Sequence, residues 1–174
     1  MYPIDERDVV VELNDVPKPR GGAPMPLVLA DDVILVLSYF LQEAAVGEDR
    51  NAGVAILEFH APLMHLLGPP NDEAMRGHPL WRRGLDSYGA CRVEQSSLLR
   101  RIAVMNYVHP RNDPAAFDQF HHYILTFEDS TFECIAKSYT KSIDRAASDD
   151  ERWRRMISLL RARNEALRSQ HREQ

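Results

Sequence analysis

The chain has 174 residues, a formal net charge of −5 and an apolar content of 44%, which are typical of one soluble domain with a sizeable core. The negative charge argues against general nucleic-acid binding. The only two cysteines, Cys91 and Cys134, exclude a disulfide-rich scaffold and predict buried free thiols in a reducing compartment. With no secretory signal and no apolar run of about 18 residues, we expect a cytoplasmic protein without membrane contact.

The first 26 residues predict an irregular arm. Val9–Leu13 can form a short edge strand, but four prolines and a Gly-Gly pair then forbid regular structure through residues 14–26. We expect residues 27–174 to form a single domain.

Two apolar segments predict the first hairpin of that domain. Residues 33–42 are apolar at both parities, which is typical of a strand covered on both faces. A polar loop at 47–53 separates them from a second strand at 54–60. A helix over part of 33–45 is the competing interpretation.

The next region combines a long loop, a strand and a helix. Residues 61–85 contain repeated Pro and Gly breaks and predict a structured loop. Residues 87–94 can form a third strand. Ser96 is placed to cap a helix to about Val108, where His109-Pro110 would end it.

The segment His121–Ala136 reads as a β-hairpin around a polar turn. If Asp129-Ser130 is a two-residue turn, Phe127 faces Phe132 and Leu125 faces Cys134. A longer symmetric loop would keep the same faces. One face is apolar; the other is mostly polar and includes His122 and Glu133.

The C-terminal segment predicts a long basic helix from about Asp149 to Ser169. Ser148 and the acids after it fit a capping box, and apolar residues follow at helical spacing. Residues 152–174 contain seven arginines and two glutamates, a net of 7 − 2 = +5. A solvent-exposed helix face is enough to explain this charge. We also expect the helix to support a homodimer. RNA binding is a weaker alternative, because no nucleic-acid-binding motif accompanies the arginines.

The polar residues of the strands are the first candidates for chemistry. Glu58 and His60 share one side of the second strand, as His122 and Glu133 share one side of the hairpin. If the two strands were neighbours, these groups could bind a metal or act as acid and base. No local metal motif such as HExxH is present, so we predict no metal and no cofactor.

The loop at 68–85 is the second candidate, because it mixes acids, an imidazole, guanidinium groups and an indole. The predicted ligand-binding set from strands and loop comprises His122, Glu133, Glu58, His60, Asp72, His78, Trp81 and Arg82. Searches for a catalytic nucleophile motif or a phosphate-binding loop find neither.

The motif HYILTFEDSTFEC at 122–134, with GPPNDEA (68–74), GHPL (77–80) and NYVHP (106–110), resembles a group of small uncharacterised bacterial proteins. The resemblance covers roughly residues 30–140. That group carries a histidine at the position of Glu128, so the chain departs from it there. The resemblance implies no activity and no catalytic residue; it implies only that the loop and the hairpin form one unit.

Together these patterns predict an α+β domain: an antiparallel sheet of four to five strands, one middle helix and a long C-terminal helix. The predicted function is non-catalytic binding of a small polar ligand or a protein partner. The alternative is a metal-assisted, hydrolase-like enzyme that uses Glu58, His60, His122 and Glu133.

Overall fold

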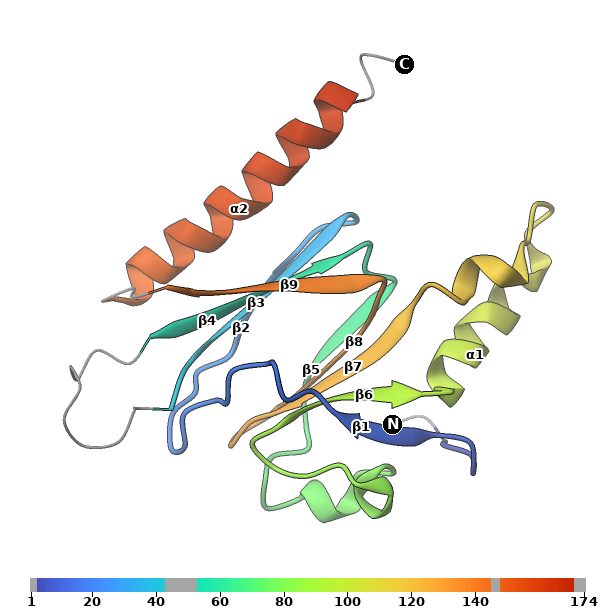
Figure 1. The fold of residues 1–174 in the computed structure, drawn as a ribbon, viewed down its shortest axis with the longest axis horizontal. Helices are drawn as coiled ribbons and strands as arrows, with labels where there is room; N and C mark the ends of the chain where they lie inside the picture. Colours follow the sequence, from blue (N-terminus) through green and yellow to red (C-terminus); the bar gives the residue numbers. More distant parts are fainter. Residues whose placement is uncertain (1–2, 43–52, 145–147, 171–174) are drawn as a thin grey trace.

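A computed structural model describes residues 3–42, 53–144 and 148–170 of the chain. Of the features expected above, the loop at 47–53 (except Gly53) and Arg172 lie outside these residues. The expected α+β class is confirmed, and every strand pair is antiparallel. The strands, however, are divided between two sheets that pack face to face (Figure 1).

The first sheet has the order β1–β6–β7–β8–β5. Its strands are β1 (Val9–Glu12), β5 (Met64–Gly68), β6 (Ala90–Glu94), β7 (His121–Thr126) and β8 (Thr131–Ala136). The expected edge strand at Val9–Leu13 is therefore found, at one edge of this sheet. Its opposite edge is β5, which falls within the segment expected to be a loop.

The second sheet has the order β2–β3–β4–β9. Its strands are β2 (Leu27–Ala30), β3 (Ile34–Phe40), β4 (Val54–His60) and β9 (Ser138–Asp144). β3 and β4 form the expected antiparallel hairpin, and the competing helix over 33–45 is wrong. The chain crosses from the first sheet to the second at Lys137, between β8 and β9.

Both faces of β3 are buried for different reasons. Leu35 and Leu37 face the other sheet, whereas Ile34 and Val36 lie on the outer face beneath the C-terminal helix, next to Met156. A strand that is apolar at both parities is expected where both faces are covered.

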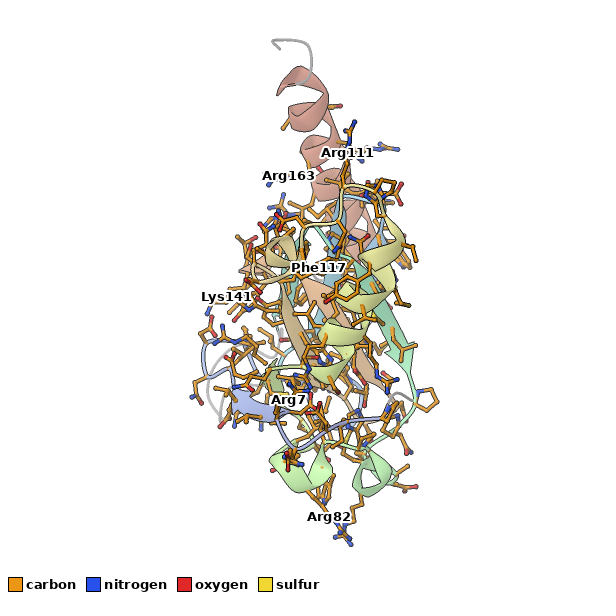
Figure 2. The ribbon with its side chains drawn as sticks, turned by 90° about the vertical axis from the view of Figure 1, so that its right-hand side faces the viewer. Arg7, Arg82, Arg111, Phe117, Lys141 and Arg163 are labelled. Atoms are coloured by element: carbon orange, nitrogen blue, oxygen red, sulfur yellow. The ribbon has the colours of Figure 1, made fainter. Side chains whose placement is uncertain are left out.

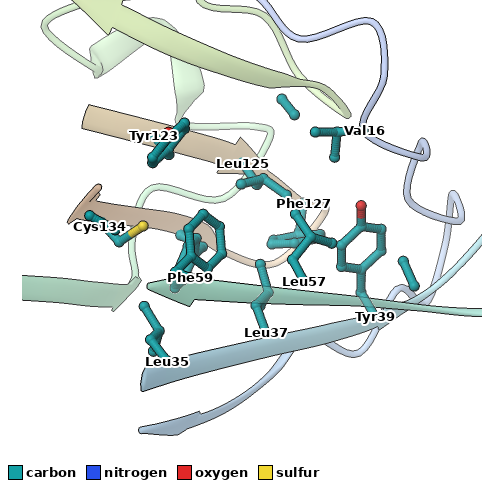
Figure 3. Close-up of a cluster of buried hydrophobic side chains, with 14 residues drawn as sticks. Val16, Leu35, Leu37, Tyr39, Leu57, Phe59, Tyr123, Leu125, Phe127 and Cys134 are labelled. Carbon is teal, nitrogen blue, oxygen red and sulfur yellow. The ribbon is translucent and has the colours of Figure 1, made fainter. Parts of the chain in front are cut away.

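The core between the sheets is rich in aromatic rings (Figure 3). Phe59 of β4 is fully buried, and its ring centre lies 5.5 Å from those of Tyr123 and Phe132 and 5.8 Å from that of Tyr139. Tilted ring pairs at such distances add to the free energy gained from burying their apolar area. Phe59 thus joins strands of both sheets.

The β7–β8 hairpin has the expected faces but a different register. Leu125 pairs with Phe132 and Thr126 with Thr131, so residues 127–130 form a four-residue loop. The backbone N–H of Phe127 donates to the carbonyl of Ser130 at 2.8 Å and closes this loop. A shift of two residues preserves parity, which is why the faces were predicted correctly while the pairs were not.

The helices are α1 (Ser97–Met105) and α2 (Asp149–Gln170), with short 3-10 helices η1 (Met75–Gly77), η2 (Trp81–Arg83), η3 (Asn106–Val108) and η4 (Pro114–Phe117). α1 lies on the outer side of the first sheet and α2 on the outer side of the second (Figure 1). Neither helix of the described residues is long and apolar enough to span a membrane.

Truncating Phe59 tests the core. Phe59→Ala should lower the free energy of unfolding by about 3–5 kcal/mol, because it leaves a cavity among rings of both sheets. Urea unfolding followed by circular dichroism measures this loss. The matched control is Val108→Ala, at a side chain that is 90% exposed, which should stay within about 0.5 kcal/mol; equal losses for both variants would contradict the assigned core.

The two free cysteines give a second test. Cys91 and Cys134 are both buried, and burial raises the pKa of the Cys91 thiol to about 12 and that of Cys134 well above its ordinary value. Both thiols should therefore stay protonated and unreactive toward Ellman's reagent at mildly alkaline pH, and both should react in denaturant. Rapid labelling of the folded protein would show that these side chains are accessible.

Candidate functional site

A carboxylate and two imidazoles meet on the outer face of the first sheet, beneath the loop at 69–85. Glu133 of β8 and His122 of β7 point to this face, and His78 reaches it from the loop between η1 and η2. The Nε2 atom of His78 lies 3.1 Å from Glu133 Oε1, and the Nε2 atom of His122 lies 3.1 Å from Glu133 Oε2. The structure thus joins three residues of the predicted ligand-binding set.

The other ring nitrogens decide how the protons are arranged. The backbone N–H of Leu80 donates to Nδ1 of His78 at 3.1 Å, so Nε2 of His78 carries the proton that Glu133 accepts. The Ser96 hydroxyl lies 2.9 Å from Nδ1 of His122 and itself accepts from the Leu99 N–H at 3.2 Å. Its own proton is free to be donated to Nδ1 of His122, and in that tautomer the Nε2–H of His122 points at Glu133.

This cluster of His78, Ser96, His122 and Glu133, called the Glu133 cluster below, is closed to solvent. Each of its members is no more than 5% exposed. A buried carboxylate needs hydrogen-bond donors, and removing them costs several kcal/mol. The cluster therefore holds the loop, the hairpin and the start of α1 in one fixed arrangement.

A second buried carboxylate, that of Asp8, is bound at the start of α1. It accepts from the Ser97 N–H at 2.6 Å and from the Asp5 N–H at 2.8 Å, and Asp8 is 1% exposed. Gln95, with a φ of 50°, turns the chain from β6 into the helix and places Ser96 at its N-cap. Two of the first N–H groups of α1, those of Ser97 and Leu99, are thereby satisfied by protein side chains.

The sequence Ser96–His122–Glu133 has the hydrogen-bond order of a serine-hydrolase triad. Ser96 is among the residues that line a surface pocket of about 380 Å³ next to α1. However, the Ser97 and Leu99 N–H groups that could stabilise an oxyanion already bind Asp8 and Ser96. A carboxylate beside a developing oxyanion would raise its energy, so the geometry favours a structural role for this chain of bonds.

Glu58 and His60 do not join the cluster. They lie on β4, on the outer face of the second sheet, so the whole core separates them from His122 and Glu133. Burial, together with the nearby charge of Arg163 on α2, lowers the pKa of His60. Within the described ranges, no group of three or more His, Cys, Asp or Glu side chains is placed to hold a metal ion.

The remaining members of the predicted set take separate places in the loop. Asp72 accepts from the Tyr88 hydroxyl at 2.7 Å, and this bond raises the pKa of Tyr88 to about 12. Trp81 packs partly buried over an apolar cluster with Leu80. Arg82 is exposed and lies at the end of the molecule farthest from α2 (Figure 2).

Two residues of this region were missed by sequence reasoning. Ser96 was recognised as a helix cap but not as the partner of His122, and Asp8 was assigned no role. The capping position was a usable signal for Ser96, because a hydroxyl at the end of β6 can reach a residue on the next strand. That β6 and β7 are neighbours follows only from the sheet order.

A second candidate site is an open groove of about 810 Å³ along α1. Its apolar lining includes Ile4 of the N-terminal segment, Met64 of β5, and Leu98, Ile102, Val104 and Met105 of α1. Val104 and Met105 are 56% and 68% exposed. This α1 groove contains none of the residues predicted to bind a ligand.

Charged side chains line the same groove. They are Arg7, Arg100, Arg101 and Asp5, a balance of 3 − 1 = +2. Arg7 and Arg100 both bond to Asp5, which lowers the pKa of that carboxyl. The groove therefore offers an apolar floor with excess positive charge.

Variants of the Glu133 cluster test its structural role. Ser96→Ala should cost about 1–2 kcal/mol of unfolding free energy through the lost cap, and Glu133→Gln about 1–3 kcal/mol because one donor is left unsatisfied. Because both act on His122, the double variant should lose less than the sum of the single losses. Strictly additive losses in urea unfolding would show that the two residues are not coupled.

The chain matches no protein-family model, and the searches of curated proteins and of solved structures find no significant match. Function must therefore be inferred from the described residues alone. They offer two candidates of opposite character: a buried, hydrogen-bonded cluster and an open, apolar groove with positive charge.

Proposed function

We propose that the protein is a non-catalytic binding domain, whose α1 groove accepts an apolar segment with acidic side chains from a protein partner. The observation that carries the proposal is the exposure of Val104 and Met105 beside the groove. Contiguous exposed apolar side chains on a folded domain are typical of interaction sites.

The residues that line the α1 groove favour one kind of partner. A floor of Met64, Leu98 and Ile102 suits the apolar face of a helix, a common mode of peptide recognition. The excess of two positive charges favours acidic residues along the edges of that face. A small polar ligand would leave most of this apolar floor uncovered.

The Glu133 cluster contributes to the proposed function by holding the start of α1 in place. It fixes Ser96, and Ser96 caps α1, so the helix that forms the groove starts from a rigid point. A preorganised surface loses less conformational entropy when a partner binds. The hydrolase-like alternative has less support, because Glu58 and His60 lie on the opposite outer face of the sandwich.

The test uses two synthetic amphipathic helical peptides with the same leucine face, one with glutamates and one with lysines on its other face. The glutamate peptide should bind more tightly by fluorescence anisotropy, and added salt should weaken it. Met105→Lys should reduce binding of both peptides by about tenfold or more, the equivalent of about 1.4 kcal/mol. Arg101→Glu should weaken the glutamate peptide and strengthen the lysine peptide.

The matched control is Val33→Lys, an exposed apolar side chain outside the groove lining, which should leave both affinities unchanged. The proposal fails if neither peptide binds, or if Val33→Lys weakens binding as much as Met105→Lys does.

A further inference from the structure

Helix α2 presents two apolar side chains that the described part of the chain leaves partly exposed. Arg152 and Met156 face the second sheet and are 3% and 0% exposed. One position further along in each case, Trp153 and Ile157 are 40% and 36% exposed. Because residues four apart lie on the same helix face, Trp153 and Ile157 form one strip on the flank of α2.

The first half of the helix is held to the domain through its other face. Met156 packs in the apolar cluster with Ile34 and Val36, and Arg152 donates to the carbonyl of Met25 at 2.8 Å. Asn164, two turns after Ile157 and on the same side of the helix, donates to Asp31 at 2.8 Å, so the accessible strip ends before Asn164. The C-terminal end of α2 projects past the sheets in both views (Figures 1 and 2), whereas Trp153 and Ile157 lie in its N-terminal half.

The charges along α2 are ordered by sign. The first turn carries Asp149, Asp150 and Glu151, whereas the later exposed turns carry Arg154, Arg155, Arg161 and Arg163 and one acid, Glu165. Two such helices side by side and parallel would bring like charges together. In an antiparallel pair, the acidic first turn of each helix lies beside the second half of the other, whose arginines outnumber its single acid, although Asp149 then lies opposite Glu165. The helix dipoles also point in opposite directions, which is favourable.

We propose that a second copy of this chain docks antiparallel across α2, with Ile157 at the twofold axis. Trp153 and Arg161 each lie four positions from Ile157, so Trp153 of one copy lies opposite Arg161 of the other. This geometry suits a cation–π contact, and Asp150 lies one turn away, within reach of the same guanidinium group. The interface is isologous, as expected for a closed dimer.

The first test is the mass of the full chain measured by light scattering over a range of concentrations. The protein should approach twice its 19.9 kDa, and Ile157→Glu should raise the dissociation constant by at least about tenfold, because each dimer loses two apolar contacts. Val108→Glu, an equivalent change at an exposed site away from α2, should leave the dimer intact. A monomer at every concentration, or equal effects of both variants, would overturn the proposal.

Reversing the charges of Asp150 and Arg161 tests whether these two side chains attract one another across the dimer interface. Asp150→Arg and Arg161→Asp should each weaken the dimer, and the two together in one chain should restore it, because the pair is rebuilt with opposite signs. Circular dichroism of each variant confirms that α2 is still formed. If the double variant is weaker than both single variants, Asp150 does not meet Arg161.

Disulfide trapping tests the direction of pairing, since Cys91 and Cys134 are buried and should remain silent. Ile157→Cys should form an intermolecular disulfide on mild oxidation, whereas Glu165→Cys should not, because two such residues lie far from the axis on opposite sides. Equal trapping of both would indicate parallel helices and overturn the antiparallel arrangement. Binding of poly(U) RNA by a protein that stays monomeric would assign the basic face to nucleic acid instead.

Discussion

The carboxylate of Glu133 lies buried between a sheet and a loop, where an ionised group without donors would cost several kcal/mol. Its two oxygens receive N–H groups from His78 and His122, and Ser96 in turn holds the far side of the His122 ring. Three segments distant in the sequence, the 69–85 loop, the β7–β8 hairpin and α1, are therefore fixed by one group. Movement of any of them would break one of these hydrogen bonds.

This constraint changes the interpretation of the most conspicuous polar residues. Imidazoles next to a carboxylate are typical of catalytic and metal sites, but here every ring nitrogen of His78 and His122 has a partner within the protein. Asp8 and Ser96 likewise occupy N–H groups at the start of α1. The Glu133 cluster therefore has a structural role, and the exposed apolar surface of the α1 groove is the better candidate for recognition of a partner.

The two proposed interaction surfaces lie on opposite sides of the sandwich. The α1 groove is on the outer side of the first sheet, and the strip of Trp153 and Ile157 is on the helix that covers the second. A dimer formed across α2 would leave the groove of each copy open. Such a dimer would present two grooves, and a partner with two suitable segments would bind it with increased avidity.

The sequence by itself determined the features that depend on neighbouring residues. Alternation fixed the faces of the β7–β8 hairpin, and the apolar residues at both parities identified β3 as a covered strand. The capping residues and helical spacing located α1 and α2. Only the tertiary structure could divide the strands between two sheets, because β2, β5 and β9 are short or polar and pair with strands whose position local patterns do not reveal. That division also decided which polar residues meet: it separated Glu58 and His60 from Glu133 by the thickness of the core, and it brought His78 to the carboxylate and Ser96 to His122 instead.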